Sequence, residues 1–295
     1  MYSCPAPAKI NLYLKVTGRR DDGMHELDTA FVYVDIADRL TISPASELTV
    51  SCSSTHLQGR RNLVYRVLAA IRETFSVTAG LDIHIEKHIP EQAGLGGGSS
   101  DAATAIMAAN AIWQLGRSAD ELIRFAAPFG ADIPCFLFGR ASAAGGIGDQ
   151  LSEYPRALPD GYFLLACPGN GLSTAEVFRH FDARAAARGS SLTPGNGGDT
   201  IRSRSQQAVA ALGDNDLESS AAALSPQLGR LLQRLRKEAV QAWMSGSGTA
   251  CVARMETCAT AETLAARLKQ DGLAVWTHVG KLQREHPMRH LDIGA

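Results

Sequence analysis

The chain begins with a segment in which apolar and polar residues alternate. Over residues 8–16, Ile, Leu, Leu and Val occupy every second position, with polar or aromatic residues between them. Successive side chains of a strand point to opposite faces of a sheet, so this pattern predicts a strand with one buried face. Lys9 and Asn11 are then neighbours on its polar face.

A second alternating segment, residues 81–89, predicts another half-buried strand. It leads into the run PEQAGLGGGSSD at residues 90–101, called the glycine loop below, which contains four glycines and two serines. Residues 102–115 are almost wholly apolar and compatible with a helix. The sequence therefore predicts a strand, a glycine-rich turn and a helix in succession.

Patterns of the same kind place the remaining elements. Strands are expected at residues 30–34, 39–42, 48–52, 162–167, 250–253 and 274–279, and helices at residues 62–75, 119–127, 205–212, 227–238 and 260–270. Strands cluster before helices, which favours an α+β fold over a doubly wound sheet. Proline and glycine gather at residues 154–161, so we expect an N-terminal domain at 1–155 and a C-terminal domain at 156–295. Residues 189–199 are poor in apolar side chains and are expected to form a mobile surface loop.

Composition narrows the class of protein. The chain has 295 residues, 45% of them hydrophobic, and a formal net charge of −1, as in globular proteins of one large or two medium domains. This charge does not indicate strong general affinity for nucleic acid or anionic membranes. The start of the chain has no signal-peptide layout and no apolar run is long enough to cross a bilayer, which favours the cytoplasm. The six cysteines are scattered, without a C-x-x-C pair, and are expected to be reduced core thiols.

The glycine loop has the chemistry of an anion site. A glycine-rich turn before a helix points backbone N–H groups and the positive end of the helix dipole at one spot. It is not a P-loop, because Ser99 follows Gly98 where that motif needs a lysine. The dinucleotide fingerprint also fits poorly, since its third glycine would fall on Ser99. The alternative is a simple turn with Ser99 or Ser100 as helix N-cap, and we interpret Asp101 as a capping residue.

Two further segments carry candidate chemistry. The first, residues 130–134, contains Asp132, and the second, residues 244–249, is another turn of glycine and serine. Taken singly, each feature has an ordinary structural explanation. Asp132 could cap a helix, Lys9 could be a solvated strand lysine, His25 could lie in a surface turn, and the second turn could be a tight connection.

Together, these segments resemble the three motifs of the GHMP small-molecule kinases in order and setting. The similarity covers most of the chain, and the triple glycine of the glycine loop is its most specific part. The matching segments are residues 7–12, 22–25, 94–103, 130–134, 215–218 and 244–249. The resemblance implies a two-domain α+β fold, with a ribosomal-protein-like N-terminal domain and a ferredoxin-like α/β C-terminal domain.

The resemblance also implies an activity. GHMP kinases use ATP with Mg²⁺, and this chain is most similar to members that phosphorylate the 2-hydroxyl of diphosphocytidyl methylerythritol in the non-mevalonate route to isoprenoid precursors. A small-molecule substrate, no nucleic acid or membrane partner, and a monomer or homodimer are therefore expected. No cluster of His or Cys argues for a tightly bound transition metal, and no residue is assigned as a metal ligand.

Position by position, the resemblance assigns roles to residues. Asp132 matches the family's catalytic aspartate and Lys9 the lysine beside it. Asn62 falls in the region that contacts adenine. The positions expected to bind the ATP phosphates are Gly94, Leu95, Gly96, Gly97, Gly98, Ser99 and Ser100. Those expected to bind the acceptor are Asn11, His25, Thr174 and Phe178, with His25 at the cytosine edge.

The chain departs from the family at Met24, where a tyrosine that stacks on cytosine is common. Stacking of a base on an aromatic ring contributes about 1 to 3 kcal/mol, and methionine contacts rings more weakly. Met24 therefore leaves open the alternative that this chain is a GHMP kinase for another small alcohol. A non-catalytic nucleotide-binding protein on the same fold is a second alternative, although binding alone would require neither Lys9 nor Asp132. A nucleic-acid-binding module is a third, against which the neutral charge argues.

Overall fold

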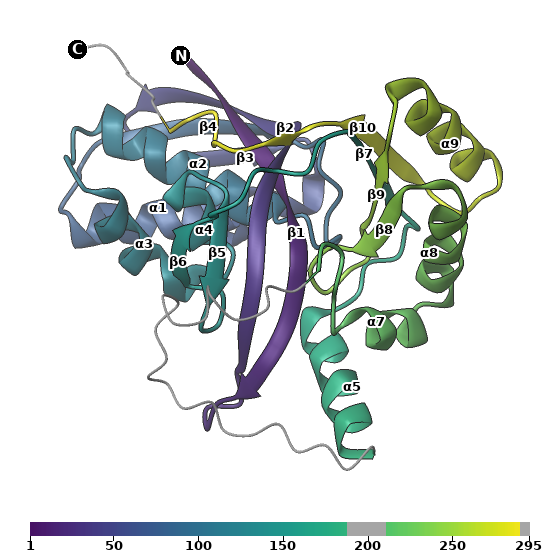
Figure 1. Ribbon diagram of the computed structural model, residues 1–295. Helices are drawn as coiled ribbons and strands as arrows, with labels where there is room; N and C mark the ends of the chain where they lie inside the picture. The colour runs from purple at the N-terminus through teal and green to yellow at the C-terminus, as the bar shows by residue number, and fades with distance from the viewer. Residues whose placement is uncertain (188–210, 290–295) are drawn as a thin grey trace.

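The computed structural model describes residues 1–187 and 211–289 and contains two antiparallel-rich sheets, each covered by helices (Figure 1). Helices α1 to α4 lie against the larger sheet, and α8 and α9 against the smaller one. The expected loop at residues 189–199 lies outside the described residues, as does most of the helix expected at 205–212.

A long hairpin runs through the middle of the molecule. Strand β1 (Tyr2–Arg19) pairs antiparallel with β2 (His25–Ala45), from Tyr2 opposite Ile42 to Arg19 opposite His25. Strands were expected at 30–34 and 39–42, and both segments are in strand, but as parts of the single continuous strand β2. A register shift between Pro7 and Ala8 accommodates the polar residues that interrupt the alternation, so that β2 continues through them.

The larger sheet has the strand order β3-β4-β2-β5-β6, and β1 and β11 also pair with β2. Its further strands are β3 (Thr49–Cys52), β4 (Gly80–Glu86), β5 (Ser142–Gly145), β6 (Gln150–Glu153) and β11 (Leu282–Gln283). Its helices are α1 (Leu63–Thr74), α2 (Gly97–Ile112), α3 (Ala119–Ala126) and α4 (Ile133–Phe138). Short 3-10 turns occur at Thr55–Leu57, Gly59–Arg61 and Ala127–Phe129. The apolar faces of β4 and α1 pack with α2 in one buried cluster, as the alternation in β4 predicted.

The smaller sheet has the order β10-β7-β9-β8 and is antiparallel throughout. Its strands are β7 (Tyr162–Cys167), β8 (Gln241–Met244), β9 (Cys251–Met255) and β10 (Trp276–Gly280). Its helices are α5 (Thr174–Ala187), α7 (Glu218–Leu224), α8 (Pro226–Glu238) and α9 (Cys258–Gln270). The sequence pattern did not predict α5, α7 or β8.

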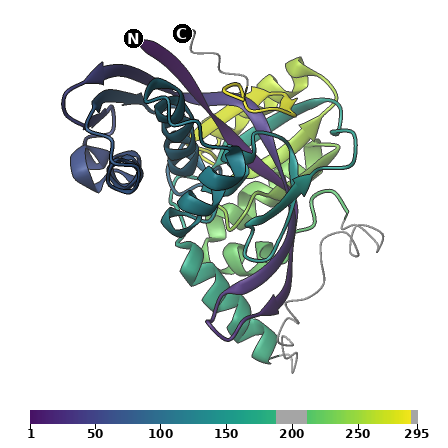
Figure 2. The ribbon, with the colours of Figure 1, turned by 90° about the vertical axis from the view of Figure 1, so that its left-hand side faces the viewer.

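A third buried cluster joins the two sheets. Ile10 and Leu12 of β1 pack with Phe163 of β7 and Trp243 of β8, and the Trp243 indole donates a hydrogen bond of 2.8 Å to the Asn11 carbonyl oxygen. Figures 1 and 2 show the hairpin running past both sheets, with its tip beside α5. The late strand β11 returns to the larger sheet, so residues from both expected domains contribute to it. The boundary at residue 155 stays a prediction.

The six cysteines all lie in the described part of the chain, and all are free thiols, five of them buried. Within residues 1–187 and 211–289, no helix has the length and apolar character needed to cross a membrane.

Candidate active site

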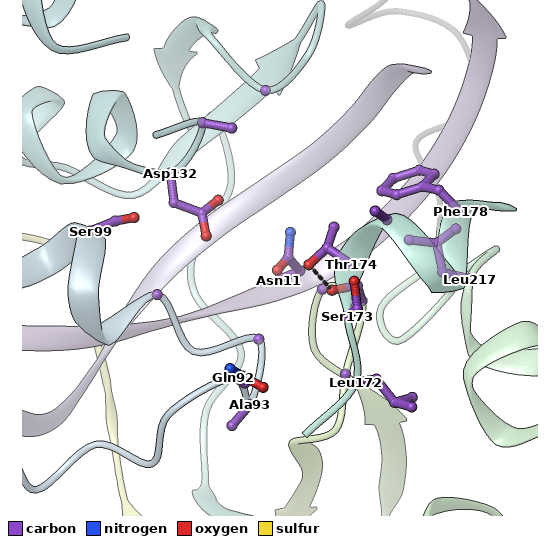
Figure 3. Close-up of a pocket in the computed structure, with 18 of the residues that line it drawn as sticks. Asn11, Gln92, Ala93, Ser99, Asp132, Leu172, Ser173, Thr174, Phe178 and Leu217 are labelled. Carbon is purple, nitrogen blue, oxygen red and sulfur yellow. Dashed lines mark hydrogen bonds between the residues drawn. The ribbon is translucent and has the colours of Figure 1, made fainter. Parts of the chain in front are cut away.

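A cavity of about 1140 Å³ is lined by the β1–β2 hairpin, the glycine loop with the start of α2, helix α5 and the turn that follows β8. Figure 3 shows Ser99 and Asp132 on one side of this cavity and Thr174 and Phe178 on the other. The sequence-predicted site residues that line it are Lys9, Asn11, His25, Gly94, Gly96, Gly97, Gly98, Ser99, Asp132, Thr174 and Phe178. Segments far apart in the sequence therefore meet in a single cavity.

The glycine loop ends at the N-terminus of α2. Gly96, just before the helix, has a left-handed backbone (φ 73°, ψ 16°), and no described side chain caps the helix. The first helical hydrogen bond runs from the Ser100 amide to the Gly96 carbonyl oxygen at 2.8 Å. The amides of residues 97–99 are thus left without a capping side chain, and together with the helix dipole they favour a bound anion.

The path of the loop requires glycine at two positions. Gly94 and Gly96 have φ values of 77° and 73°, which side chains rarely allow. A Cβ on Gly94 would lie 2.6 Å from the Ser245 carbonyl oxygen, and one on Gly96 would lie 2.9 Å from the Phe136 ring. The loop therefore packs directly against the backbone of the turn at residues 245–249.

Lys9, Asn11 and Asp132 form a connected group in the wall of the cavity. The Lys9 side chain is only 3% exposed, and its Nζ lies 3.5 Å from Asp132 Oδ2 and donates to Asn11 Oδ1 at 3.0 Å. The side chain of Asn11 is held in turn by a 2.8 Å hydrogen bond, which its Nδ2 donates to the Thr29 hydroxyl. Lys9 is therefore a buried, paired cation, not a solvated strand lysine.

Asp132 does not act as a helix cap. It is the residue before α4, but its side chain makes no capping hydrogen bond there. Its carboxylate is 35% exposed and faces Lys9 across the cavity. This position leaves an oxygen of Asp132 accessible to a bound molecule.

The turn at residues 245–249 connects the glycine loop to β1. The Ser245 hydroxyl accepts a hydrogen bond from the Asn11 amide at 3.2 Å and donates one to the Gly94 carbonyl oxygen at 3.3 Å. The hydroxyl of Ser247, two residues further along the turn, forms a 2.9 Å hydrogen bond with the hydroxyl of Thr174 at the start of α5 (Figure 3). The turn thus fixes the loop, β1 and α5 relative to one another.

The other end of the cavity is aromatic. The His25 imidazole stacks on the Phe178 ring, with centroids 4.5 Å apart and an interplanar angle of 21°. Met24, from the same hairpin tip, also lines the cavity and is 47% exposed. This end offers a flat apolar surface beside a group that can form hydrogen bonds, as a nucleobase requires.

Comparisons with known proteins agree with this arrangement. Models of the "GHMP kinases N terminal domain" and "GHMP kinases C terminal" match residues 62–140 and 202–273. A protein of Alcanivorax borkumensis named 4-diphosphocytidyl-2-C-methyl-D-erythritol kinase is 35% identical over 274 residues, covering 90% of this chain and 86% of the relative. The chain belongs to the GHMP kinase family. The members of this family are small-molecule kinases.

Other GHMP kinases agree at the level of sequence or of fold. A relative from Desulfitobacterium hafniense with the same printed name is 38% identical, over 92% of this chain and 94% of its own length. A solved structure titled 4-(cytidine 5'-diphospho)-2C-methyl-D-erythritol kinase is 33% identical, with a TM-score of 0.74 and coverage of 95% and 99%. The L. major mevalonate kinase, solved with R-mevalonate, is only 16% identical, with a TM-score of 0.66 and 96% coverage of both chains, and shares the fold.

Three of the expected site residues do not line the cavity of this GHMP kinase. Leu95 and Ser100 are buried in the protein, 1% and 0% exposed. Asn62 caps α1, accepting from the Val64 amide at 2.8 Å and donating to the Leu57 carbonyl oxygen at 2.6 Å. Their expected contacts with ATP stay predictions, although Leu57 and Leu63, beside Asn62, do line the cavity.

The interpretation of Asp101 as a helix cap is wrong. Its carboxylate is buried and lies 2.7 Å from the Nζ of Lys87, which also contacts Asp38. Burial raises the pKa of Asp101 to about 7, an effect that the Lys87 ammonium opposes. Sequence reasoning missed Lys87, which lines the cavity just before the glycine loop. Its partners, Asp38 and Asp101, come from other parts of the chain. The only sequence signal for Lys87 was therefore its position near the end of a predicted strand.

Proposed function

We propose that this chain transfers the γ-phosphoryl group of ATP to the 2-hydroxyl of 4-diphosphocytidyl-2-C-methyl-D-erythritol, in the non-mevalonate route to isoprenoid precursors. The observation that carries the proposal is the Lys9–Asp132 pair, at 3.5 Å, in one cavity with a helix N-terminus and a stacked aromatic surface. These three parts correspond to a phosphate donor, a reacting hydroxyl and a nucleobase. The names of the relatives that match over most of this chain support the same substrate.

The glycine loop fits the phosphates of ATP. Its uncapped amides and the positive end of α2 favour negative charge. Apart from the adjoining residues and the backbone of α2 itself, no atom of the described residues lies within 4 Å of the Cβ that Gly98 lacks. When bound, ATP supplies the phosphoryl group, and Mg²⁺ neutralises charge on the phosphates. We assign the phosphate contacts to Gly96, Gly97, Gly98 and Ser99.

The described residues also fit a magnesium ion held mainly by the nucleotide. They contain no group of three or more His, Cys, Asp or Glu side chains that could hold a metal. Mg²⁺ commonly binds through one or two carboxylates together with substrate phosphates and water. The Asp132 carboxylate and the Ser99 hydroxyl, which lie on the same side of the cavity (Figure 3), would supply protein oxygens to such an ion.

Asp132 is the base that takes the proton from the acceptor hydroxyl. Lys9 orients this carboxylate and offsets negative charge on the transferring group, because its buried ammonium lies between Asp132 and Asn11. Asn11 is fixed by Thr29 and presents its amide oxygen to Lys9. This group positions the reactants and balances charge, which is what phosphoryl transfer requires of a protein.

The acceptor lies between this group and the hairpin tip. We assign Asn11 and Thr174 to the middle of the acceptor, and His25 and Phe178 to its cytosine. Because Met24 replaces an aromatic ring, stacking depends on Phe178.

Replacing Gly98 by alanine tests the phosphate end. The free protein has room for the added methyl group, so we expect normal folding. A methyl group beside the amides hinders the approach of phosphate, and the KM for ATP should rise about tenfold, as expected for the loss of one charge-assisted hydrogen bond. Steady-state kinetics measure this change. The control is Gly229→Ala in α8, where the added Cβ makes only ordinary contacts, the nearest at 3.8 Å, and an unchanged KM in Gly98→Ala would remove the loop from the phosphate site.

Acceptor specificity tests the proposed substrate. Purified protein with ATP and Mg²⁺ is expected to phosphorylate diphosphocytidyl methylerythritol and to leave homoserine and mevalonate unchanged. Met24→Tyr should lower the KM for this acceptor about tenfold, since stacking on an aromatic ring contributes about 1 to 3 kcal/mol. Turnover of another alcohol alone would identify a different GHMP kinase, and binding of ATP without any turnover would favour a non-catalytic protein.

A further inference from the structure

A carboxylate outside the expected site residues holds His25 in place. Nε2 of His25 lies 2.7 Å from Asp182 Oδ1, and Asp182 projects from α5, one turn beyond Phe178. Nη1 of Arg19, in the hairpin, lies 3.5 Å from the second oxygen of Asp182, Oδ2. All four side chains line the cavity. The imidazole is therefore fixed by a ring below it and by a carboxylate at one edge.

This contact determines which ring nitrogen carries hydrogen. A carboxylate only accepts hydrogen bonds, so the hydrogen shared by His25 and Asp182 belongs to Nε2. The neutral imidazole has a single N–H group, which leaves Nδ1 as an acceptor. Nδ1 makes no hydrogen bond with any residue of the described segments, so none of them competes with a ligand for this nitrogen.

An acceptor at this position distinguishes two pyrimidines. The 4-position of cytosine carries an amino group, which donates hydrogen bonds, whereas that of uracil carries an oxygen, which only accepts them. A bare Nδ1 can accept from the cytosine amino group, but faces a second lone pair in uracil. A doubly protonated imidazole would lose this distinction, because it would donate to acceptor atoms that both bases possess.

The ring geometry is compatible with such a contact. A hydrogen bond to a ring nitrogen lies close to the plane of that ring, so a base bound to Nδ1 is nearly coplanar with His25. His25 is in turn nearly parallel to Phe178, with an interplanar angle of 21°. The base would then lie on the same side of the Phe178 ring as the imidazole, which combines stacking with recognition of the base edge.

We propose that Asp182 is a positioning residue that holds His25 in the Nε2–H tautomer, so that Nδ1 accepts from the cytosine amino group and the site selects cytidine over uridine. This inference rests on the proposed function, because it takes the nucleobase of the acceptor to bind at His25. Asp182 itself touches neither the base nor the reacting atoms. Its effect is on recognition of the acceptor and not on the chemical step.

Asp182→Asn tests this role with little change of shape. An asparagine side chain can accept from Nε2–H or donate to a bare Nε2, so it no longer selects one tautomer. The control is Glu176→Gln, which removes an exposed carboxylate from the same helix. Titration calorimetry without ATP compares the binding of diphosphocytidyl methylerythritol with that of its uridine analogue and requires no turnover.

For Asp182→Asn, we expect the preference for cytidine to fall about tenfold, the size of one hydrogen bond, with kcat changed by less than about twofold. The control should keep both values. Nitrogen-15 NMR of the histidine rings should show Nε2–H for His25 in the unliganded protein and a mixture of tautomers in Asp182→Asn. An Nδ1–H tautomer in the native protein, or an unchanged preference in the variant, would overturn the proposal. A native protein that binds cytidine selectively but transfers no phosphate would contradict the proposed function alone.

Discussion

Asp132→Asn is expected to lower kcat by about two to four orders of magnitude, the usual contribution of a general base. The amide keeps the shape of the side chain but cannot take the proton of the acceptor hydroxyl. Lys9 retains Asn11 as a partner at 3.0 Å, so the centre of the cavity should stay folded. The glycine loop is untouched, and ATP in the absence of Mg²⁺ should bind with unchanged affinity.

Single-turnover kinetics and calorimetric titration with ATP separate these two expectations. The control is Asp120→Asn, which removes an exposed carboxylate in the first turn of α3. It should change neither kcat nor ATP affinity. If kcat of Asp132→Asn stayed within about tenfold of the native value, below the usual range for a lost base, the assignment of the base would be wrong.

Lys87→Met is expected to lower the free energy of unfolding by about 3 to 5 kcal/mol, the usual cost of leaving a buried charge without its partner. The Lys87 ammonium contacts both Asp38 and Asp101, whose side chains are 0% and 6% exposed. Asp38 still accepts from the amides of His88 and Ile89 at 2.6 and 2.8 Å. Asp101 has no such compensation, because its Oδ1 lacks a hydrogen-bond partner among the described residues.

The stability of the folded protein is expected to depend on pH through Asp101, and the direction of this dependence follows from the pKa of Asp101. Burial raises the pKa of Asp101 from 3.8 to about 7, so the folded protein holds this proton more tightly than the unfolded chain. Its contribution to stability is therefore fully present below pH 3.8 and is lost as the pH rises through about 7. Without the Lys87 ammonium, the loss on raising the pH should be larger.

Urea unfolding at a series of pH values measures both effects of Lys87→Met. Adding Asp101→Asn to this variant removes the unpaired charge and should restore part of the stability. The exposed Lys269→Met in α9 serves as control and should change the free energy of unfolding by less than about 0.5 kcal/mol. A loss of stability as small as this in Lys87→Met would mean that Lys87 does not stabilise the two carboxylates.

The sequence predicted the fold well where burial was periodic. β4 and α8 carry clear apolar faces, and their predicted positions agree with the structure to within a few residues. Helix α5 was missed because only Val177 within it is fully buried, which leaves no apolar stripe to detect. Helix α2 begins five residues before the predicted start, because Gly97 and Gly98 belong to its first turn and Gly96 takes the left-handed conformation.

The candidate site was predictable where one segment carried the signal. The glycine loop indicates an anion site by itself, whereas the alternation around Lys9 indicated only a polar face. Burial of Lys9 depends on Asp132 and Phe31, which other segments bring to it. Asp182 lies 157 residues from His25 in the chain, so no local pattern could reveal their contact.

Identification of the product gives the sharpest test of the proposed reaction. Purified native protein is mixed with ATP, Mg²⁺ and diphosphocytidyl methylerythritol, and the product is studied by carbon-13 and phosphorus-31 NMR. We predict one new phosphate monoester per ADP formed, with phosphorus coupling to C2 of the erythritol unit and to its methyl carbon. Formation of ADP without a phosphorylated acceptor, or a phosphate on another hydroxyl, would contradict the proposed function.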